Sequence, residues 1–560
     1  MVRLAFWSVL IGLSLLITDL QALEKCSVGV TRRGTPIEGW AQANYFDLDF
    51  QGQRILVVGG VYDQESVERV KRLSDEFDSP SKRAVAFIPD LYPDAEKGNV
   101  IVEQDLAHFY RSSGNPEVQY LIGWAAYHVT DCIVILSPSA QTGVKANEVL
   151  FKHHGGEFLD TELIVPDEPL GYPSAILAGS KHYGIRLEVI ELPSPQRRMT
   201  DHHWITKLSE VSTKSAARLD FQKRVLDVDE KTEQLLAVYG RSMKTISYIP
   251  ALAMMAQYQS HRYGRKNGLP VAQLNRIVES HLKRPLPDNG SGIAGHLVLF
   301  SALESTNDDA WKLACKERIL EVADLYHTRP TEYQGQRLMP YHSEMSDAVF
   351  MGGPILALAD TVTREFNDPR YSVACASHLQ ACAKMNQLAN GLYQHSPQDS
   401  AAWGRGNGFA ALGTSICLGF LSPETEGYEQ VQANFVRHIE ALVKHQDKTG
   451  SWHQVIDHPE SYPEFTSTCM ITSAIVLGIQ SHALKMADYQ SVILRARQAT
   501  LRRIAPGGFI NDVCTGTGKQ KNLRAYYDRE AIQGRNDRAG AMALLLFTLL
   551  EEVELNESKR

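Results

Sequence analysis

The chain has 560 residues, of which 44% are hydrophobic and 22% are charged, and its formal net charge is -8 at pH 7. A chain of this length exceeds what one hydrophobic core normally serves, so we expect at least two domains. The acidic balance argues against a nucleic-acid-binding protein, which would carry a basic face, but it allows a small anionic ligand held by a few local cations.

The first 22 residues have the pattern of a secretory signal peptide. Arg3 precedes an apolar stretch at 4–17 that is short for a membrane span, and Leu20-Gln21-Ala22 resembles a cleavage site. We therefore expect export to the periplasm or the medium, with no membrane attachment after cleavage. An uncleaved amino-terminal anchor is the alternative interpretation.

Residues 27–200 alternate short apolar runs with helical patterns, which predicts a smaller α/β domain of uncertain role. The apolar runs end in Gly, Pro or Ser, as buried parallel strands do, and they lie at 54–61, 84–93 and 131–139. The helical patterns between them lie at 65–77 and 120–129. Two prolines and two arginines at 192–198 indicate a linker.

From residue 205 to residue 560, strand signals nearly vanish and helical periodicity recurs about twelve times. The helical patterns lie at 228–243, 246–262, 269–283, 291–305, 308–326, 347–362, 371–388, 402–420, 427–446, 464–481, 487–503 and 536–554. GFAALGTSICLGF is apolar all round, whereas YEQVQANFVRHIEALVKHQ is amphipathic. Such alternation of buried and half-exposed helices predicts an all-α (α/α)6 barrel of six hairpins. An open α-solenoid is the alternative, but solenoids usually show a sequence repeat, and we see none.

Three stretches at the starts of apolar helices carry the candidate chemistry. They are SDAVFMGGPILALAD (346–360), AAWGRGNGFAALG (401–413) and GSWHQVIDHPESYPEFTSTCMITSAIVLG (450–478). Together they closely resemble glycoside hydrolase families 105 and 88, the unsaturated rhamnogalacturonyl and unsaturated glucuronyl hydrolases. The resemblance spans about residues 225–555, and WGRGNG is its most specific motif.

This resemblance implies an enzyme that acts on the anionic oligosaccharides left by polysaccharide lyases. Such an enzyme removes the 4,5-unsaturated uronic acid at the non-reducing end by hydrating its double bond. A carboxylic acid donates a proton to C4, water adds at C5, and the hemiketal opens and sheds the sugar. The distance between two carboxylates therefore does not report retention or inversion here. Neither a metal nor a cofactor is expected.

The resemblance assigns the acid to Asp347 and a second active-site carboxylate to Asp288. The chemistry needs an acid that is protonated part of the time near neutral pH, and a neighbouring carboxylate would raise its pKa. Because Gly352-Gly353-Pro354 follow, Asp347 is expected before the helix or on a kinked first turn. A helix N-cap is the structural alternative for Asp347.

The WGRGNG motif supplies candidate substrate contacts. Trp403 offers a stacking face, Arg405 is suited to clamp a carboxylate or hydroxyl groups with its planar fork, and Asn407 is suited to cap the helix that follows. The alternative is a core tryptophan, a surface arginine and a flexible turn.

Four further residues are weaker candidates for binding substrate. His395 matches a family histidine, and His342 lies five residues before Asp347, where this sequence departs from the family pattern. Trp452 and Gln454 belong to the third motif and are expected to line the pocket. Glu464, in the same motif, is explained equally well as the start of a helix.

Three rival interpretations stay open. An ordinary glycosidase or a polysaccharide lyase would use a similar barrel, and a carbohydrate-binding protein would keep the barrel without turnover. In the amino-terminal region, RILVVGGVYDQES distantly resembles the metal-binding strand of zinc carboxypeptidase-like deacylases. Only Glu65 of the expected zinc ligands survives there, so such a domain would have lost its metal. Oligomeric state and the parent polysaccharide are left open.

Overall fold

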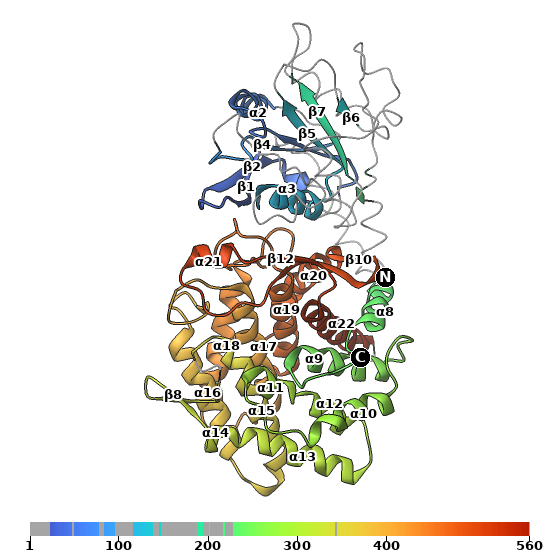
Figure 1. Ribbon diagram of the computed structural model, residues 1–560, viewed down its shortest axis with the longest axis vertical. Coiled ribbons are helices and arrows are strands. Elements are labelled where there is room, and N and C mark those ends of the chain that lie inside the picture. The colour runs from blue at the N-terminus through green and yellow to red at the C-terminus, as the bar shows by residue number, and fades with distance from the viewer. Residues whose placement is uncertain are drawn as a thin grey trace, which may run out of the picture. The chain divides into compact units, whose positions relative to one another are not determined.

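A computed structural model describes residues 23–47, 50–77, 83–95, 116–137, 145–146, 187–193, 201, 215, 217–218, 228–341 and 344–558 (Figure 1). The chain forms two compact units, one of residues 1–110, 128–177 and 186–218 and the other of residues 111–127, 178–185 and 219–560. The predicted signal peptide at 1–22 and His342 lie outside the described residues, so export stays a prediction.

The first unit is built on a seven-stranded sheet in the order β1-β2-β4-β3-β5-β7-β6. Strands β4, β3, β5 and β7 run parallel, while β1 and β2 form an antiparallel hairpin and β6 pairs antiparallel with β7. The strands are β1 (Glu24–Val30), β2 (Pro36–Ala41), β3 (Arg54–Val58), β4 (Ala84–Ile88), β5 (Cys132–Ser137), β6 (Lys145–Ala146) and β7 (Glu188–Pro193). The helices here are α1 (Ala43–Phe46) and α2 (Gln64–Glu76).

The three strands at the centre of this sheet are buried along their whole length. Every residue of β3, β4 and β5 is buried, as expected of parallel strands covered on both faces. These strands coincide with the apolar runs of the sequence, which confirms the predicted α/β character. The hairpin of β1 and β2 was not anticipated.

The second unit contains the predicted barrel. Its inner ring consists of α9 (Tyr248–Arg262), α11 (Gly290–Gly295) with α12 (Val298–Glu304), α15 (Ala348–Thr363), α17 (Gly404–Phe420), α19 (Phe465–Gln480) and α22 (Asp537–Ser558). Each inner helix contacts the next one along the chain, and α22 returns to contact α9. The ring is therefore closed, which confirms the (α/α)6 barrel and excludes an open solenoid.

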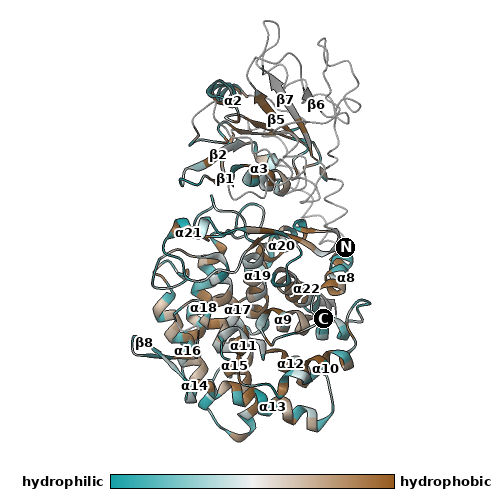
Figure 2. Cartoon of the chain, viewed as in Figure 1, coloured by the Kyte–Doolittle hydropathy of each residue, from teal (hydrophilic) through white to brown (hydrophobic). Residues whose placement is uncertain are grey.

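The outer helices are α8 (Val228–Val238), α10 (Val271–Leu282), α13 (Asp309–Ala323), α16 (Arg370–Asn386), α18 (Tyr428–Val443) and α20 (Met486–Arg502). They alternate with the inner helices along the chain. Figure 2 shows apolar residues gathered on inner helices such as α22 and polar residues on outer helices such as α13 and α18. Among the described helices, none is long and apolar enough to cross a membrane.

Close packing of the inner helices requires small residues. A Cβ on Gly413 of α17 would lie 2.7 Å from the Cα of Phe350 in α15, so only glycine allows this approach. Since the outer helices lead the chain back, the inner helices all begin at the same end of the barrel. We call this end the mouth. Here lie β11 (Phe509–Cys514), which contacts α19, and α21 (Leu523–Tyr527). The remaining elements of the unit are α3 (Pro116–Tyr127), α14 (Leu325–Thr328), β8 (Thr331–Tyr333), β9 (Gln336–Leu338), β10 (Ile504–Ala505) and β12 (Ala531–Gly534).

Candidate active site

Asp347 is the residue immediately before α15. Its carbonyl accepts the N–H groups of Phe350 at 3.0 Å and Met351 at 2.9 Å, and these bonds start the helix. Its side chain makes no capping hydrogen bond within the described residues, although many N-terminal aspartates do. Asp347 thus precedes the helix, as predicted, and Pro354 lies further along inside it. The carboxyl group is directed elsewhere.

The Asp347 carboxylate contacts a histidine instead. Its Oδ2 lies 3.2 Å from Nε2 of His395, and the two side chains are 9% and 0% exposed. On the other side of the ring, Nδ1 of His395 lies 2.9 Å from the hydroxyl group of Tyr526. The backbone N–H of Ser346 also donates to the carbonyl of His395 at 2.9 Å, which fixes the two loops together. The Asp347 carboxyl group, the His395 imidazole and the Tyr526 phenol therefore form one line of consecutive contacts.

The hydrogen bonds assign protons along this line. The backbone N–H of Gln520 donates to the Tyr526 oxygen at 3.3 Å, which leaves the phenolic proton to point at Nδ1 of His395. Burial raises the pKa of Tyr526, so the phenol keeps that proton. With Nδ1 accepting, the ring proton lies on Nε2, which faces Oδ2 of Asp347 at 3.2 Å.

Trp403 provides the wall behind His395. The two ring centroids lie 4.4 Å apart at 47°, and Trp403 is only 1% exposed. The indole occupies the N-cap position of α17. A Cβ on Gly406 would lie 2.7 Å from Oγ of Ser346 and 3.1 Å from Cε3 of Trp403. The glycine of the motif is therefore needed for the loop that carries Asp347 to approach.

Arg405 is buried and holds the loop after β11. Its Nη1 donates to the carbonyl of Cys514 at 2.8 Å, its Nη2 donates to the carbonyl of Thr515 at 2.7 Å, and its Cζ lies 4.6 Å from the Trp403 ring centre. Burial disfavours its charge, but acidic groups nearby, led by Cys514 and Glu464, raise the pKa of the guanidinium above its ordinary value. Arg405 acts here on the backbone, and its contact with substrate stays a prediction.

Asn407 lies inside the first turn of α17 rather than ahead of it. Its Nδ2 donates to the carbonyls of Tyr393 at 2.7 Å and Trp403 at 3.0 Å, and its Oδ1 accepts the Tyr393 N–H at 2.8 Å. The predicted capping role is thus replaced by a tie to the segment that leads to His395. The Asn407 side chain and the two residues that it bonds, Tyr393 and Trp403, are all buried.

The third motif divides into a core residue and a residue near the site. Trp452 is 0% exposed and its indole N–H donates to the Leu442 carbonyl at 2.7 Å, so it packs in the core instead of lining a pocket. Gln454 Nε2 donates to the Tyr526 carbonyl at 3.2 Å, and its backbone carbonyl accepts the Gly404 N–H at 2.8 Å. Gln454 therefore joins the second motif to the loop of Tyr526.

Glu464 is the N-cap of α19, in agreement with the alternative interpretation that it starts a helix. Its carboxylate accepts the N–H groups of Thr466 at 3.1 Å and Ser467 at 2.6 Å, and it also accepts the N–H of Cys514 at 3.0 Å. The last of these bonds anchors β11 beside Arg405. Neither Cys514 nor Tyr526 was among the site residues predicted from the sequence.

Asp288 lies at the mouth but is exposed. It precedes α11, and its Oδ1 accepts a hydrogen bond from Asn289 Nδ2 at 2.8 Å. Asn289 is the N-cap of α11 and accepts the Gly292 N–H at 2.8 Å. Within the described residues no ion pair or hydrogen bond joins Asp288 to Asp347, so its role as the second carboxylate stays a prediction.

A second aspartate–histidine pair lies in the loop before α19. Asp447 Oδ2 is 3.0 Å from Nε2 of His453, and Asp447 Oδ1 accepts the Thr449 hydroxyl at 2.7 Å and the Ser451 N–H at 2.8 Å. Burial would raise the pKa of Asp447, but the hydrogen bonds from His453 and its neighbours hold it at about 2. In the described part of the chain, no three His, Cys, Asp or Glu side chains group as metal ligands.

Residues 253–553 match the sequence profile of glycosyl hydrolase family 88. The chain belongs to this family. It is therefore a glycoside hydrolase. The unsaturated rhamnogalacturonyl hydrolase YesR of Bacillus subtilis (strain 168) is 29% identical over 261 residues, which are 43% of this chain and 71% of YesR.

Solved structures of similar fold include a possible GH105 member from Klebsiella pneumoniae, at 18% identity and a TM-score of 0.49, which covers 62% of this chain and 97% of that one. Another is a family 88 glycosyl hydrolase from Bacteroides vulgatus, at 16% identity and a TM-score of 0.46, with 60% and 99% covered.

Proposed function

We propose that the barrel removes a 4,5-unsaturated uronic acid from the non-reducing end of lyase-generated oligosaccharides. The observation that carries this proposal is the Asp347 carboxyl group, which is buried, makes no helix cap and contacts His395. An acid held in this way is suited to general acid–base work rather than to helix capping. The family membership and the name of the B. subtilis relative support the class of substrate.

Asp347 must first gain a proton, since its contact with the His395 N–H favours the carboxylate. Approach of the anionic uronate would raise the pKa of Asp347 by adding a second negative charge and by excluding water. The acid then gives this proton to C4 of the double bond, and positive charge develops at C5, where the ring oxygen stabilises it.

Water adds at C5 and loses a proton to the Asp347 carboxylate, which restores the acid. The resulting C5 hemiketal opens when its bond to the ring oxygen breaks, giving a ketone at C5 and a hemiacetal at C1. Collapse of the hemiacetal releases the rest of the oligosaccharide as an alcohol. His395 and Tyr526 hold the acid in place, and the N–H of His395 stabilises the carboxylate between the two proton transfers.

A panel of unsaturated disaccharides from rhamnogalacturonan, ulvan and glycosaminoglycan lyases tests this proposal. Hydration destroys the conjugated double bond, so the absorbance of the unsaturated product should fall with enzyme and stay constant without it. A lyase would raise this absorbance on intact polysaccharide. An ordinary glycosidase would release sugar and leave the absorbance unchanged. Either of these two results, or binding without turnover of any member, contradicts the proposal.

A further inference from the structure

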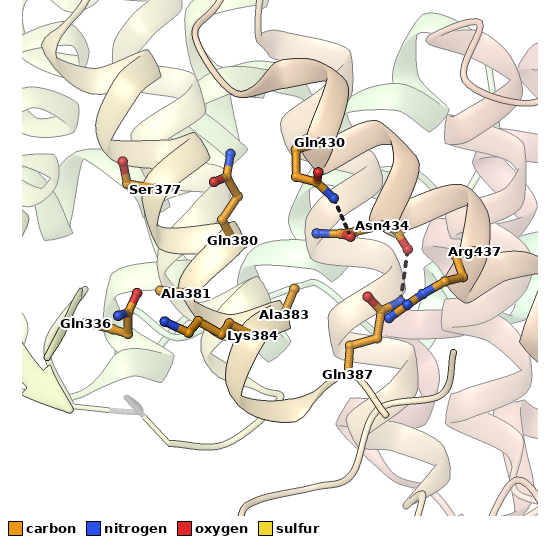
Figure 3. Close-up of a pocket in the computed structure, with 10 residues that line it drawn as sticks. All are labelled: Gln336, Ser377, Gln380, Ala381, Ala383, Lys384, Gln387, Gln430, Asn434 and Arg437. Carbon is orange, nitrogen blue, oxygen red and sulfur yellow. Dashed lines mark hydrogen bonds between the residues drawn. The ribbon is translucent and has the colours of Figure 1, made fainter. Parts of the chain in front are cut away.

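A polar groove runs along the outside of the barrel between α16 and α18. Its volume is about 540 Å³, and it is lined by Gln336, Ser377, Gln380, Ala381, Ala383, Lys384, Gln387, Gln430, Asn434 and Arg437 (Figure 3). Five of these ten residues carry a carboxamide and two carry a positive charge, while none carries a carboxylate. The lining is thus cationic in a protein whose net charge is -8.

The two cations have no acidic partner in the described part of the chain. Lys384 and Arg437 are exposed, and neither forms an ion pair with a carboxylate of the described residues. Figure 3 shows Lys384 extending from α16 and Arg437 reaching from α18 toward Gln387. Two unpaired cations facing one groove favour an anionic ligand, because each gains a charge-assisted hydrogen bond when the ligand binds.

The amide groups are partly fixed and partly available. Gln387 Nε2 donates to the Asn434 carbonyl at 3.0 Å, and Gln430 Nε2 donates to Asn434 Oδ1 at 3.0 Å. The first bond links the end of α16 to α18, and the second fixes two side chains of α18 one turn apart. Nδ2 of Asn434 and Oε1 of Gln387 remain to bind a ligand. A carboxamide both donates and accepts, which suits the hydroxyl groups of a sugar.

Charge along the barrel surface sets the direction of a bound chain. A second groove meets the first at Gln430 and is lined by Glu424 and Glu429. The anionic groups of a ligand therefore belong near Lys384 and Arg437, away from this acidic end.

The groove adjoins the segment that carries His395. Gln387 forms an isolated antiparallel bridge with Tyr393, two residues before His395. A Cβ on Gly391 would lie 3.0 Å from the carbonyl of Arg437, so this segment packs directly against α18. A saccharide in the groove would lie on the outer side of the loop whose inner side holds the catalytic pair.

We propose that this groove, which we call the α16–α18 groove, is a second binding site for acidic oligosaccharides built from uronic acids. The proposal rests on the proposed function, since the same substrates supply the uronates. The groove contains no aromatic side chain for stacking, so binding depends on charge and weakens as salt is added. It would retain longer uronate chains near the mouth.

Isothermal titration calorimetry with saturated hexagalacturonate tests the site, because this ligand has no double bond for Asp347 to protonate. Replacing both Lys384→Ala and Arg437→Ala should weaken binding about tenfold or more. The matched control replaces Arg276→Ala on α10 and Lys283→Ala directly after α10. It removes the same charge from another face of the barrel and should bind like the wild type. Unchanged affinity in the first variant, or equal loss in the control, would overturn the site.

Two further measurements separate this proposal from others. A neutral hexasaccharide should bind weakly, and equal binding of neutral and acidic chains would contradict the role of charge. The groove variant should still hydrolyse an unsaturated disaccharide at the wild-type rate, because the groove lies outside the catalytic pair. Loss of that turnover would place these residues in catalysis instead. Failure of the wild type to hydrolyse any unsaturated disaccharide would reject the proposed function, and the binding result would still stand.

Discussion

The pairs Asp347–His395 and Asp447–His453 both lie in loops of the barrel, but they differ in the second partner of the histidine. In one pair, Asp347 contacts Nε2 of His395 at 3.2 Å, and the other ring nitrogen faces the hydroxyl of Tyr526. In the other pair, Asp447 contacts Nε2 of His453 at 3.0 Å, and the other nitrogen faces the carbonyl of Ser461. A hydroxyl both donates and accepts, whereas a carbonyl only accepts.

This difference decides whether protons can move. Both nitrogens of His453 face acceptors, and the hydrogen bond from His453 helps to hold the pKa of the Asp447 carboxyl at about 2. Such a pair is held in one arrangement. His395 has an acceptor on one side and a hydroxyl on the other, so its Nδ1 can either accept or donate a hydrogen bond. The Asp447 pair is therefore structural, and the Asp347 pair is suited to catalysis.

The largest expected effect is a loss of activity, and it distinguishes Asp347 from Asp447. Asp347→Asn keeps the size of the side chain but cannot donate and recover a proton, so kcat on an unsaturated disaccharide should fall about 10³-fold or more. The unfolding midpoint in urea should stay near that of the wild type, because the side chain caps no helix.

Asp447→Asn is the matched control for this loss, and its kcat should stay within a factor of about three of the wild type at neutral pH, where a structural ion pair has no part in proton transfer. An active Asp347→Asn enzyme, or equal loss of kcat in both variants, would remove the distinction between the pairs.

The next effect is on stability and depends on pH. Because the pKa of Asp447 lies near 2 in the folded protein and near 3.8 when unperturbed, Asp447→Asn should lower the free energy of unfolding by about 2 kcal/mol at pH 6. A lowered pKa stabilises the fold above the unfolded value and loses that contribution as the pH falls through the folded one. The difference between variant and wild type should therefore shrink below pH 4, toward zero near pH 2.

Urea titrations of both proteins at several pH values measure this difference. A difference that stays constant down to the lowest pH would mean that the loss comes from packing and not from the charge of Asp447.

The sequence predicted the barrel well because each helix carries its own periodic pattern. The expected helix at 464–481 is α19, and the expected helix at 371–388 is α16, with ends displaced by only one or two residues. The patterns at 291–305 and 308–326 were exceptions, since the structure breaks the first into α11 and α12 and the second into α13 and α14. The hairpin of β1 and β2 was also missed, because pairing at a sheet edge leaves little trace in a short sequence window.

The site was harder to predict because roles depend on which way a side chain points. Trp452 and Trp403 occur in similar motifs, yet one donates its N–H into the core and the other stacks on His395. Arg405 has the fork of a substrate clamp, but its two terminal nitrogens bind carbonyls of residues more than 100 positions away. Tyr526 comes from the last barrel loop, so no local pattern connects it to His395.

The smallest expected effect concerns that tyrosine. Tyr526→Phe removes the hydroxyl that donates to Nδ1 of His395 and leaves this nitrogen buried without its donor. Without this donor, the ring proton of His395 is no longer held on Nε2, the nitrogen that faces Asp347. We therefore expect kcat to fall about tenfold while KM changes little. Because this hydroxyl orients the ring nitrogen opposite the one that faces Asp347, the shape of the pH profile of kcat should also change.

The pH profile distinguishes this positioning role from simple packing. Loss of packing would lower kcat by the same factor at every pH and leave the shape of the profile intact. Tyr120 is a matched control, because it is a partly buried tyrosine that packs on the Trp403 cluster without a bond to His395. Tyr120→Phe should therefore keep the wild-type profile. If Tyr526→Phe also keeps it, the comparison of the two pairs loses its basis, since the hydroxyl is what sets His395 apart from His453.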